Sequence, residues 1–469
     1  MGSWVINGQM SIVVVVTTNH IKLNTMKKTI LILIFSALVS GLINAQAPAE
    51  AYPLTNSLYK LWEEGKTEQA IDSTLKLYKL YSPLLIDNFH NTLAQYLQNK
   101  NFISNSTIYL EELHKRKNEG INRIIEPIYL WSKTINNTDP IRLNKIINEL
   151  SRLLTDSANY LSYAERYCLL VLKEPNIQNL IDQKTKQQLL LKVIRNLENY
   201  PYLTQEVKGR KEMEKRAWNR YLLAYSYSFL YSKFDQKEEY LMKASNYSPD
   251  DTDSQLEYAY FYDAALLTGN IRQIGFKKDY FNYLKANHKN QESLSLLSEI
   301  TFDVPSDYNL KELIDFYATL SLVKPFKDYW FLFINQKCKN APQLKIEYTN
   351  GTLDLTQKQD HWVYIDVWGT WCGPCVKELP DLQAFFTKNN EDAKSIIKVC
   401  TFSYSSQNLA SFMNTNHYTF PVSEIDKQIN DAFKISSYPT KILITPDGKY
   451  LKIPYGADWK MYIRNYCLM

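Results

Sequence analysis

The sequence predicts two structural classes in one chain: an all-α array of helical hairpins, followed by a smaller α/β domain. Apolar residues recur every three or four positions through residues 46–337, which is the period of an α-helix. Glycine is scarce there, with only five residues. From residue 338 onward the composition changes, because five of the six cysteines and seven of the 17 prolines lie in residues 338–469. We therefore place a domain boundary at Cys338, and we expect each part to fold by itself.

Composition and charge limit the class of protein. The chain has 469 residues, of which 45% are hydrophobic and 22% charged. This globular composition excludes a collagen, a disordered tail protein and a polytopic membrane protein. The net charge is +5, and it falls to +2 for the part that begins at Gln46, because three lysines and no acid precede that residue. A nearly neutral protein has no electrostatic footprint for nucleic acid, so we expect no nucleic-acid partner.

Residues 26–45 have the layout of a secretory signal peptide. Met26 is followed by two lysines, by an apolar stretch from Ile30 to Ile43, and by small residues around Ala45. The stretch is shorter than the about 20 residues of a membrane-spanning helix, and an uncleaved anchor is the alternative. We exclude residues 1–25, which have the character of a non-native start or a disordered leader. The mature protein is therefore expected outside the cytoplasm, where disulfide chemistry is permitted.

Residues 46–337 contain a weak repeat signal. Gly65 and Ala70 have the spacing of the second helix of a tetratricopeptide repeat, and so does the stretch from Ser232 to Pro249. Both matches are irregular, because Pro83 comes one residue late and a serine replaces the glycine in the second stretch. We therefore predict a helical-hairpin array of tetratricopeptide-like character, in which neighbouring hairpins bury a continuous core.

Aromatic side chains recur at helical spacing in two places of this domain. One interpretation is an aromatic-walled groove for a peptide or protein ligand. The other is core packing between helices, which we favour because any packed helix shows such a stripe. The first stripe is Tyr221, Tyr225 and Phe229, and the second is Tyr258, Phe261 and Tyr262.

The strongest chemical signal is the pair Cys372 and Cys375. The nearly all-apolar run from Trp362 to Trp368 precedes it and is typical of a central buried strand. A helical stripe of apolar residues begins at Val376. The two cysteines therefore lie where a strand turns into a helix N-terminus, whose unpaired N–H groups and dipole stabilise a thiolate. A thiolate is the nucleophile of disulfide exchange.

Two other interpretations of the cysteine pair are weaker. Half of a zinc site would need a second ligand pair, and the sequence has no second Cys-x-x-Cys and no close pair of histidines. A purely structural disulfide rarely joins residues only three apart at a helix start. We therefore expect no metal and no cofactor.

Residues 338–469 resemble a thioredoxin fold and, within it, the TlpA/ResA-like thiol-disulfide oxidoreductases of the bacterial envelope. A predicted hairpin spans Leu344 to Leu355 around an Asn-Gly turn. The stretch from Cys375 to Pro380 matches the Cys-x-x-Glu-x-Pro motif of that family, and Tyr438-Pro439 lies where the fold keeps its cis-proline. The family's extra helix and strand are expected around Gln407 to Val422. The resemblance covers less than a third of the chain.

The resemblance implies a role for each residue of the site. Cys372 would attack the client disulfide, and Cys375, one turn further into the helix, would resolve the mixed disulfide. Asp366 occupies the position of the buried acid of thioredoxin, where burial would raise its pKa and let it take the proton of Cys375; the alternative is a carboxylate satisfied by backbone groups. Glu378 either modulates the thiols or is solvated. The expected substrate-binding residues are Trp371, Gly373, Pro374, Tyr438 and Pro439.

We interpret the chain as an envelope thiol-disulfide oxidoreductase that reduces disulfides of client proteins. Oxidation or isomerisation of those disulfides is the alternative. The Gly-Pro pair between the cysteines is that of thioredoxin, whose reduction potential is about −270 mV. The implied partners are disulfide-containing clients and a membrane electron donor. The rival interpretation is a helical binding or scaffold module with a redox-sensing or passive thioredoxin-like adapter. A peroxidase is a third option, but peroxiredoxins have a Thr-x-x-Cys loop where this chain has Cys-Gly-Pro-Cys.

The remaining four cysteines have no evident chemistry. Cys400 lies in a strand-like run and Cys168 in a helical one, so both are expected to be buried and inert. Cys338 and Cys467 bracket the C-terminal domain. They either form a second, structural disulfide or stay unpaired, because connectivity cannot be deduced from sequence.

Overall fold

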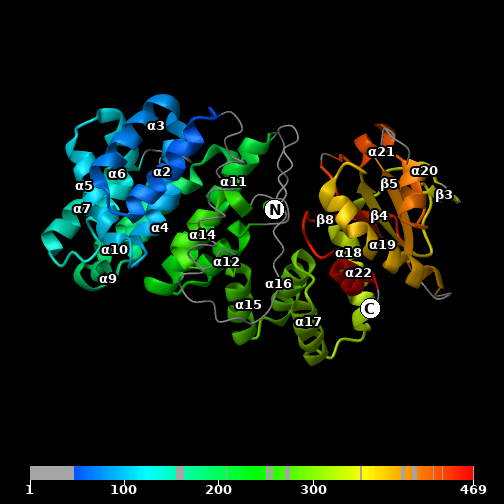
Figure 1. Ribbon diagram of the computed structural model, residues 1–469. Helices are drawn as coiled ribbons and strands as arrows, with labels where there is room; N and C mark the ends of the chain where they lie inside the picture. Colours follow the sequence, from blue (N-terminus) through cyan, green and yellow to red (C-terminus); the bar gives the residue numbers. More distant parts are fainter. Residues whose placement is uncertain are drawn as a thin grey trace. The chain divides into compact units, whose positions relative to one another are not determined.

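The computed structural model of the chain is shown in Figure 1. It describes residues 47–154, 163–207, 209–249, 253, 257–269, 275–348, 351–391, 397–403, 409–425, 427–435 and 437–467. The predicted leader at 1–25 and the predicted signal peptide at 26–45 lie outside these residues. Within the described ranges, no helix combines the length and the apolar character that a membrane crossing requires.

The chain divides into two compact units, and the division falls between Tyr283 and Leu284. The predicted fold class is confirmed: the described part of the first unit is helical, and the second contains a mixed β-sheet of the thioredoxin type. The division lies inside α15 (Phe276–Ala286), ahead of the compositional boundary at Cys338.

The described part of the first unit is a succession of helices. Their bounds are α2 (Ala51–Glu63), α3 (Thr67–Asp87), η1 (Asn88–Leu93), α4 (Ala94–Leu97), α5 (Ile103–Lys115), α6 (Glu119–Ser132), α7 (Pro140–Leu153), α8 (Ala164–Lys173), α9 (Pro175–Leu180), α10 (Gln183–Glu198), η2 (Pro201–Leu203), α11 (Arg210–Lys233), α12 (Glu238–Tyr247), η3 (Glu257–Ala259) and α14 (Phe261–Thr268).

The connection between α2 and α3 explains one residue of the weak repeat signal. Gly65 has a φ of 67°, a left-handed conformation that favours glycine. A Cβ atom at this position would also lie 3.0 Å from the side-chain amide of Asn105. The tight turn lets α2 and α3 pack as a hairpin, and Trp62 at the end of α2 is buried against Phe89 and Tyr109. Such aromatic contacts build a continuous core between the hairpins.

The second unit begins with helices and continues into the sheet. Its elements after α15 are α16 (Asn290–Asp303), α17 (Asp307–Thr319), α18 (Phe326–Lys337), β1 (Lys339–Asn340), β2 (Lys345–Tyr348), β3 (Gly351–Asp354), β4 (Trp362–Trp368), α19 (Gly373–Glu391), β5 (Ile397–Ser403), α20 (Leu409–Thr415), β6 (Val422–Glu424), α21 (Lys427–Ala432), β7 (Thr440–Ile444), β8 (Lys449–Ile453) and α22 (Trp459–Cys467).

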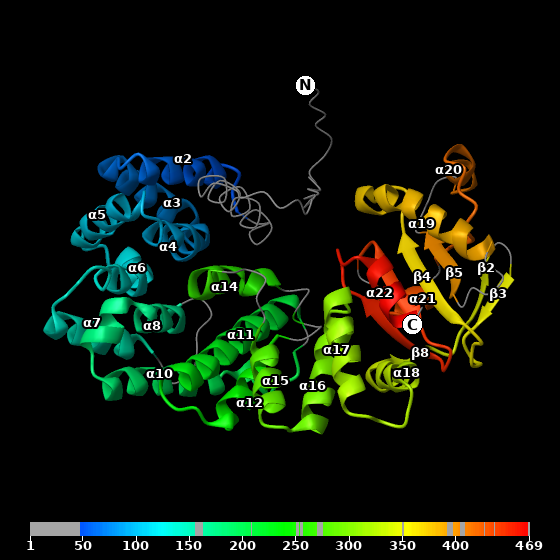
Figure 2. The ribbon, with the colours of Figure 1, turned by 90° about the horizontal axis from the view of Figure 1, so that it is seen from below.

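The sheet has six strands in the order β1-β8-β7-β4-β5-β6. In Figure 2, β4 and β5 lie side by side, as their parallel pairing requires. Strands β4, β5 and β6 run parallel, whereas β7 and β8 are antiparallel to their neighbours. The predicted hairpin is present as β2 and β3, and the predicted extra helix and strand are present as α20 and β6. These sequence expectations are therefore confirmed.

Strand β4 is the centre of the sheet, and all seven of its residues are buried. Its side chains alternate between two faces, as a period of two requires. Tyr364 contacts Phe385 of α19 and Trp459 of α22, so the face that includes Asp366 is covered by these two helices. Val363 and its odd-numbered neighbours form the other core, with α21 and the hairpin. Asp366 is thereby directed toward the helix that contains the cysteine pair.

Helices α16, α17 and α18 pack against the C-terminal helix α22. The indole Nε1 of Trp330 donates to the backbone oxygen of Asn465 at 3.0 Å, and the ring of Phe302 stacks on Tyr466. Arg464 forms an ion pair with Asp307 at 2.8 Å. These contacts explain why the compact unit that contains the sheet begins well before Cys338. The expectation that residues 338–469 fold by themselves stays a prediction.

Candidate active site

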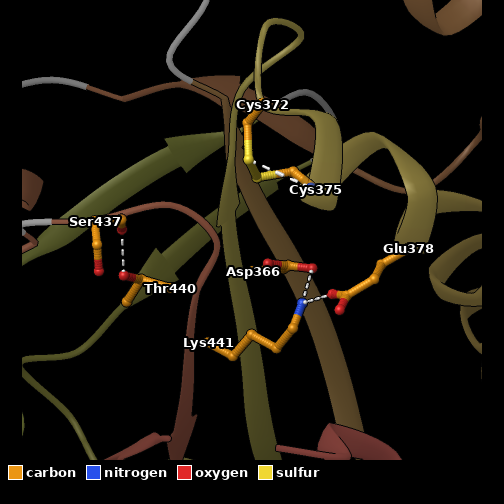
Figure 3. The surroundings of a disulfide bond; sticks show 7 residues. All are labelled: Asp366, Cys372, Cys375, Glu378, Ser437, Thr440 and Lys441. Carbon is orange, nitrogen blue, oxygen red and sulfur yellow. Dashed lines mark hydrogen bonds and ion pairs between the residues drawn. A yellow bond between two sulfur atoms is a disulfide. The ribbon is translucent and has the colours of Figure 1, made fainter. Parts of the chain in front are cut away.

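The cysteine pair lies at the junction that the sequence predicts. Strand β4 ends at Trp368, and helix α19 begins at Gly373. Cys372 and Cys375 form a disulfide with Cα atoms 5.2 Å apart, and both residues are buried. The backbone N–H of Cys375 donates to Cys372 Sγ, with an N···S distance of 3.3 Å (Figure 3). The helix N-terminus therefore directs a donor at the sulfur on which negative charge would develop.

Asp366 is buried in β4, on the sheet face that α19 covers. Its Oδ2 accepts a hydrogen bond from Lys441 Nζ at 2.9 Å, so the alternative of a carboxylate satisfied by backbone groups does not hold. Burial raises the pKa of Asp366, and Glu378 raises it further, while the charge and hydrogen bond of Lys441 lower it; the net direction is upward. Asp366 Oδ1 has no hydrogen-bond partner among the described residues.

Lys441 is the residue that sequence reasoning missed. It lies in β7 directly opposite Asp366 of β4, and its side chain is buried. Its ammonium also pairs with Glu378 Oε2 at 2.8 Å (Figure 3). A signal was present in the sequence, because a lysine directly precedes the apolar run from Ile442 to Ile444. Burial would lower the pKa of Lys441, but the two facing carboxylates raise it above its ordinary value.

Glu378 lies one helical turn after Cys375 on α19, and its side chain is 38% exposed. It is therefore neither wholly solvated nor isolated, because it shares Lys441 with Asp366. The site thus contains a disulfide, two carboxylates and one ammonium, drawn from β4, α19 and β7. Such a set can exchange a disulfide and move a proton.

The expected substrate-binding residues form one border of the disulfide. Trp371 is 60% exposed, and its ring packs edge-on against Tyr438 with centroids 5.4 Å apart. The peptide bond between Tyr438 and Pro439 is cis, as the resemblance implies. Gly373 is exposed, and Pro374 is half-buried in the first turn of α19. An exposed aromatic surface thus lies next to the buried sulfur atoms.

The other four cysteines take no part in a disulfide. Cys168 and Cys400 are fully buried, and burial raises the pKa of both thiols, which accords with inert residues. No disulfide joins Cys338 to Cys467, so the structural bridge considered between them is not formed. Cys467 is buried in α22 against the core, whereas Cys338 ends α18 in a half-buried position.

The aromatic stripes of the helical unit lie mainly in the core. Tyr221 is fully buried and stacks on Tyr260. Tyr225 and Phe229 are also buried, although both line a cavity of about 420 Å³ between α8, α11 and α15. The core interpretation is therefore confirmed for this stripe, and a ligand of the helical unit stays a prediction.

Comparison with known proteins concerns the C-terminal part of the chain. Residues 338–452 match the AhpC/TSA family. The chain is 33% identical over 129 residues to the thiol-disulfide oxidoreductase ResA of Bacillus subtilis, which covers 27% of this chain and 72% of that protein. It is 24% identical to ResA of Halalkalibacterium halodurans over 32% of this chain and 88% of that protein. Among solved structures, StoA of Bacillus subtilis aligns at 22% identity and a TM-score of 0.23, covering 26% of this chain and 97% of StoA.

The fold and the site together define a thioredoxin-like thiol-disulfide oxidoreductase. The sheet order, the cysteine pair at a strand-to-helix junction and the cis-proline beside it are all present in the described residues. Through this domain, the chain belongs to the ResA family of thiol-disulfide oxidoreductases.

Proposed function

We propose that the protein reduces disulfides of client proteins, with Cys372 as the attacking thiol and Cys375 as the resolving thiol. The observation that supports this assignment is the donation from the Cys375 backbone N–H to Cys372 Sγ at the start of α19. A helix N-terminus stabilises a thiolate at the first cysteine more than at one a turn further in, because the effect declines within the first turn.

The reaction transfers two electrons from the enzyme dithiol to the client disulfide. The Cys372 thiolate attacks one client sulfur, a mixed disulfide forms, and the other client sulfur leaves as a thiolate. Cys375 then gives its proton to a base and attacks Cys372 Sγ. The enzyme disulfide forms, and the second client thiolate leaves and takes up a proton. Asp366 is the proposed base, with Glu378 near it.

The exposed aromatic surface is the proposed place where the client binds. Trp371 and Tyr438, packed edge-on, offer an aromatic surface beside the buried sulfur atoms, and the backbone around Pro439 would pair with an extended client segment. Gly373 and Pro374 would contact the client at the start of the helix. Such contacts orient the client disulfide toward Cys372.

The proposed compartment is the periplasm or cell envelope, on the strength of the signal-peptide pattern at residues 26–45. There the enzyme disulfide would be reduced again by a dithiol partner in the membrane. The rival function is a helical binding module with a passive or redox-sensing thioredoxin-like domain. It gains support from the size of the helical unit, which has a core of its own.

Turnover of an insulin-type disulfide, with a small dithiol as electron source, tests the proposal. The unaltered protein should reduce the substrate, whereas C372S should lose turnover. C375S should accumulate a mixed disulfide, which is seen as a band of higher mass on a non-reducing gel. C338S is the matched control, because it removes a thiol outside the site and should keep the activity. Full activity of C372S would contradict the two-cysteine mechanism, and no turnover by the unaltered protein would favour the binding module.

A further inference from the structure

Lys441 joins the three elements that form the site. Strand β4 leads into the cysteine motif, helix α19 begins within it, and strand β7 follows the cis-proline. Lys441 of β7 contacts Asp366 of β4 and Glu378 of α19 at 2.9 Å and 2.8 Å (Figure 3). The three charged groups thus form one cluster, although they are distant in sequence.

The sheet register positions this cluster near the resolving cysteine. Asp366 and Lys441 are direct partners across the antiparallel pair of β4 and β7. Because Lys441 also reaches Glu378, both side chains lie on the α19 side of the sheet. Glu378 follows Cys375 by three residues, so the two occupy the same face of α19 one turn apart.

Glu378 and Lys441 have opposite effects on the pKa of Asp366. The Glu378 carboxylate lies close to the buried Asp366, and its like charge disfavours the ionised form of Asp366. The ammonium of Lys441 opposes this effect, since it lowers the pKa of Asp366 through its charge and its hydrogen bond. In return, both carboxylates hold Lys441 in its charged form despite burial.

We propose that Lys441 is a positioning residue of the disulfide exchange: it keeps Asp366 ionised beside Glu378, so that the pair accepts the proton of Cys375 at neutral pH. The inference rests on the proposed function, because Cys375 releases its proton only in the resolving step. Asp366 Oδ1, which lacks a partner among the described residues, is the free acceptor site. The partly exposed Glu378 provides the exit of the proton to solvent.

The proton balance of this step is closed. Cys375 loses its proton to the carboxylate pair, and its sulfur forms the bond to Cys372 Sγ as the client thiolate leaves. The proton then passes to solvent, and the client thiolate takes up an equivalent one. No oxidant or reductant beyond the client disulfide takes part in the step.

The other groups around the cluster do not compete for this role. On β4, the buried Tyr364 is kept protonated, because burial and the two carboxylates raise its pKa. On α22, the ring of Trp459 lies 5.7 Å from Lys441 Nζ, and Lys460 pairs with Asp381 of α19. The register partners on the flanking strands are uncharged: Thr401 of β5 lies opposite Asp366, and Ile453 of β8 opposite Lys441.

The pH profile of disulfide exchange tests the inference with two substitutions of opposite sign. K441M removes the charge that lowers the pKa of Asp366, so the midpoint of the profile should rise by about one pH unit or more. The rate at neutral pH should then fall about tenfold for each unit of that rise. E378Q removes the like charge, so the midpoint should move down. K441R keeps the positive charge and should restore most of the original profile.

The matched control is K460M, which removes a lysine from beside the same Trp459 ring but not from Asp366. Its profile should equal that of the unaltered protein. A packing role for Lys441 would lower the rate at every pH without moving the midpoint, and this outcome would overturn the inference. If K441M does not fold, E378Q decides: an unmoved or upward midpoint contradicts the proposal.

A second readout needs no substrate. Aspartate labelled with ¹³C in its side-chain carboxyl group reports the titration of Asp366 in the full-length oxidised protein, and D366N identifies its signal. The titration should move upward in K441M and downward in E378Q. An unmoved titration would overturn the role of Lys441, whereas absence of insulin reduction by the unaltered protein would contradict the proposed function instead.

Discussion

Asp366 is a charged residue in a strand that is otherwise apolar or aromatic and wholly buried. A buried carboxylate loses hydration free energy, and one ammonium compensates it only in part. The net upward direction of its pKa means that the folded protein binds the proton of Asp366 more readily than the unfolded chain does. The ionised form of Asp366 therefore lowers the free energy of unfolding.

A pH dependence of stability follows from that direction. Between the ordinary pKa of an aspartate and the raised pKa of Asp366, the folded state holds more protons than the unfolded state. The free energy of unfolding should therefore fall as the pH rises through this range, by about 1.4 kcal/mol for each unit that separates the two pKa values. D366N should flatten this dependence. Urea titrations at several pH values, with labelling of the buried Cys400 thiol read by mass spectrometry, measure it.

The control for this experiment is D381N, because Asp381 is exposed and its pair with Lys460 lies at the surface. Surface pairs contribute about 0–1 kcal/mol, so the pH dependence of D381N should match that of the unaltered protein. A dependence that D366N leaves unchanged would mean that other groups cause it.

The residues of the site were predictable to different degrees. Cys372 and Cys375 stand in a motif whose flanks show a strand and a helix, and Asp366 is conspicuous as an acid in an apolar run. Lys441 was not predicted, because its role depends on the register between β4 and β7, two strands separated by more than 70 residues of sequence. Local patterns predict elements well, but pairing between distant strands is decided by the packing of the whole sheet.

At the scale of elements, the buried indole of Trp330 connects α18 to α22. Trp330 of α18 is 1% exposed, stacks on Phe333 of its own helix and donates to the backbone of Asn465. The strands of this unit could be predicted, because short apolar runs and turn residues mark them. The packing of α18 on the sheet domain could not, because amphipathic helices on both sides of Cys338 have the same local pattern.

Replacement of that indole tests the packing of the two helices. W330A should lower the free energy of unfolding of the second unit by about 3–5 kcal/mol, as large-to-small changes of buried aromatic residues do. Labelling of the buried Cys467 thiol in rising urea measures this stability. W371A is the matched control, since Trp371 is 60% exposed and should change stability little. Equal stabilities of the two variants would show that α18 does not stabilise the sheet domain.

At the scale of the whole molecule, two compact units share one chain, and the division lies in α15 rather than at Cys338. The change in composition at Cys338 coincides with the first strand, whereas the division in α15 separates two groups of residues that contact mainly one another. Helices α16, α17 and α18 belong by composition to the helical part and by contact to the sheet. This difference predicts which fragments of the protein can exist alone.

Two fragments distinguish the boundaries. Residues 287–469 keep the contacts of Trp330 and Phe302 with α22, and this fragment should fold cooperatively and reduce insulin. Residues 338–469 lack them and should unfold at a lower urea concentration. Circular dichroism and turnover of both fragments provide the measurement. If residues 338–469 match the longer fragment in stability and activity, the boundary at Cys338 is the functional one.

The ends of the sheet have a further consequence, for the solubility of the protein. Strand β1 has only two residues, Lys339 and Asn340, both exposed, and it covers the free side of β8. At the opposite end, β6 has three residues and ends at Glu424. A short outer strand has few unpaired backbone N–H and C=O groups with which a strand of another molecule could pair. A charged side chain on that strand disfavours the pairing further. The thioredoxin-like domain should therefore resist aggregation through pairing of its outer strands, even at high protein concentration.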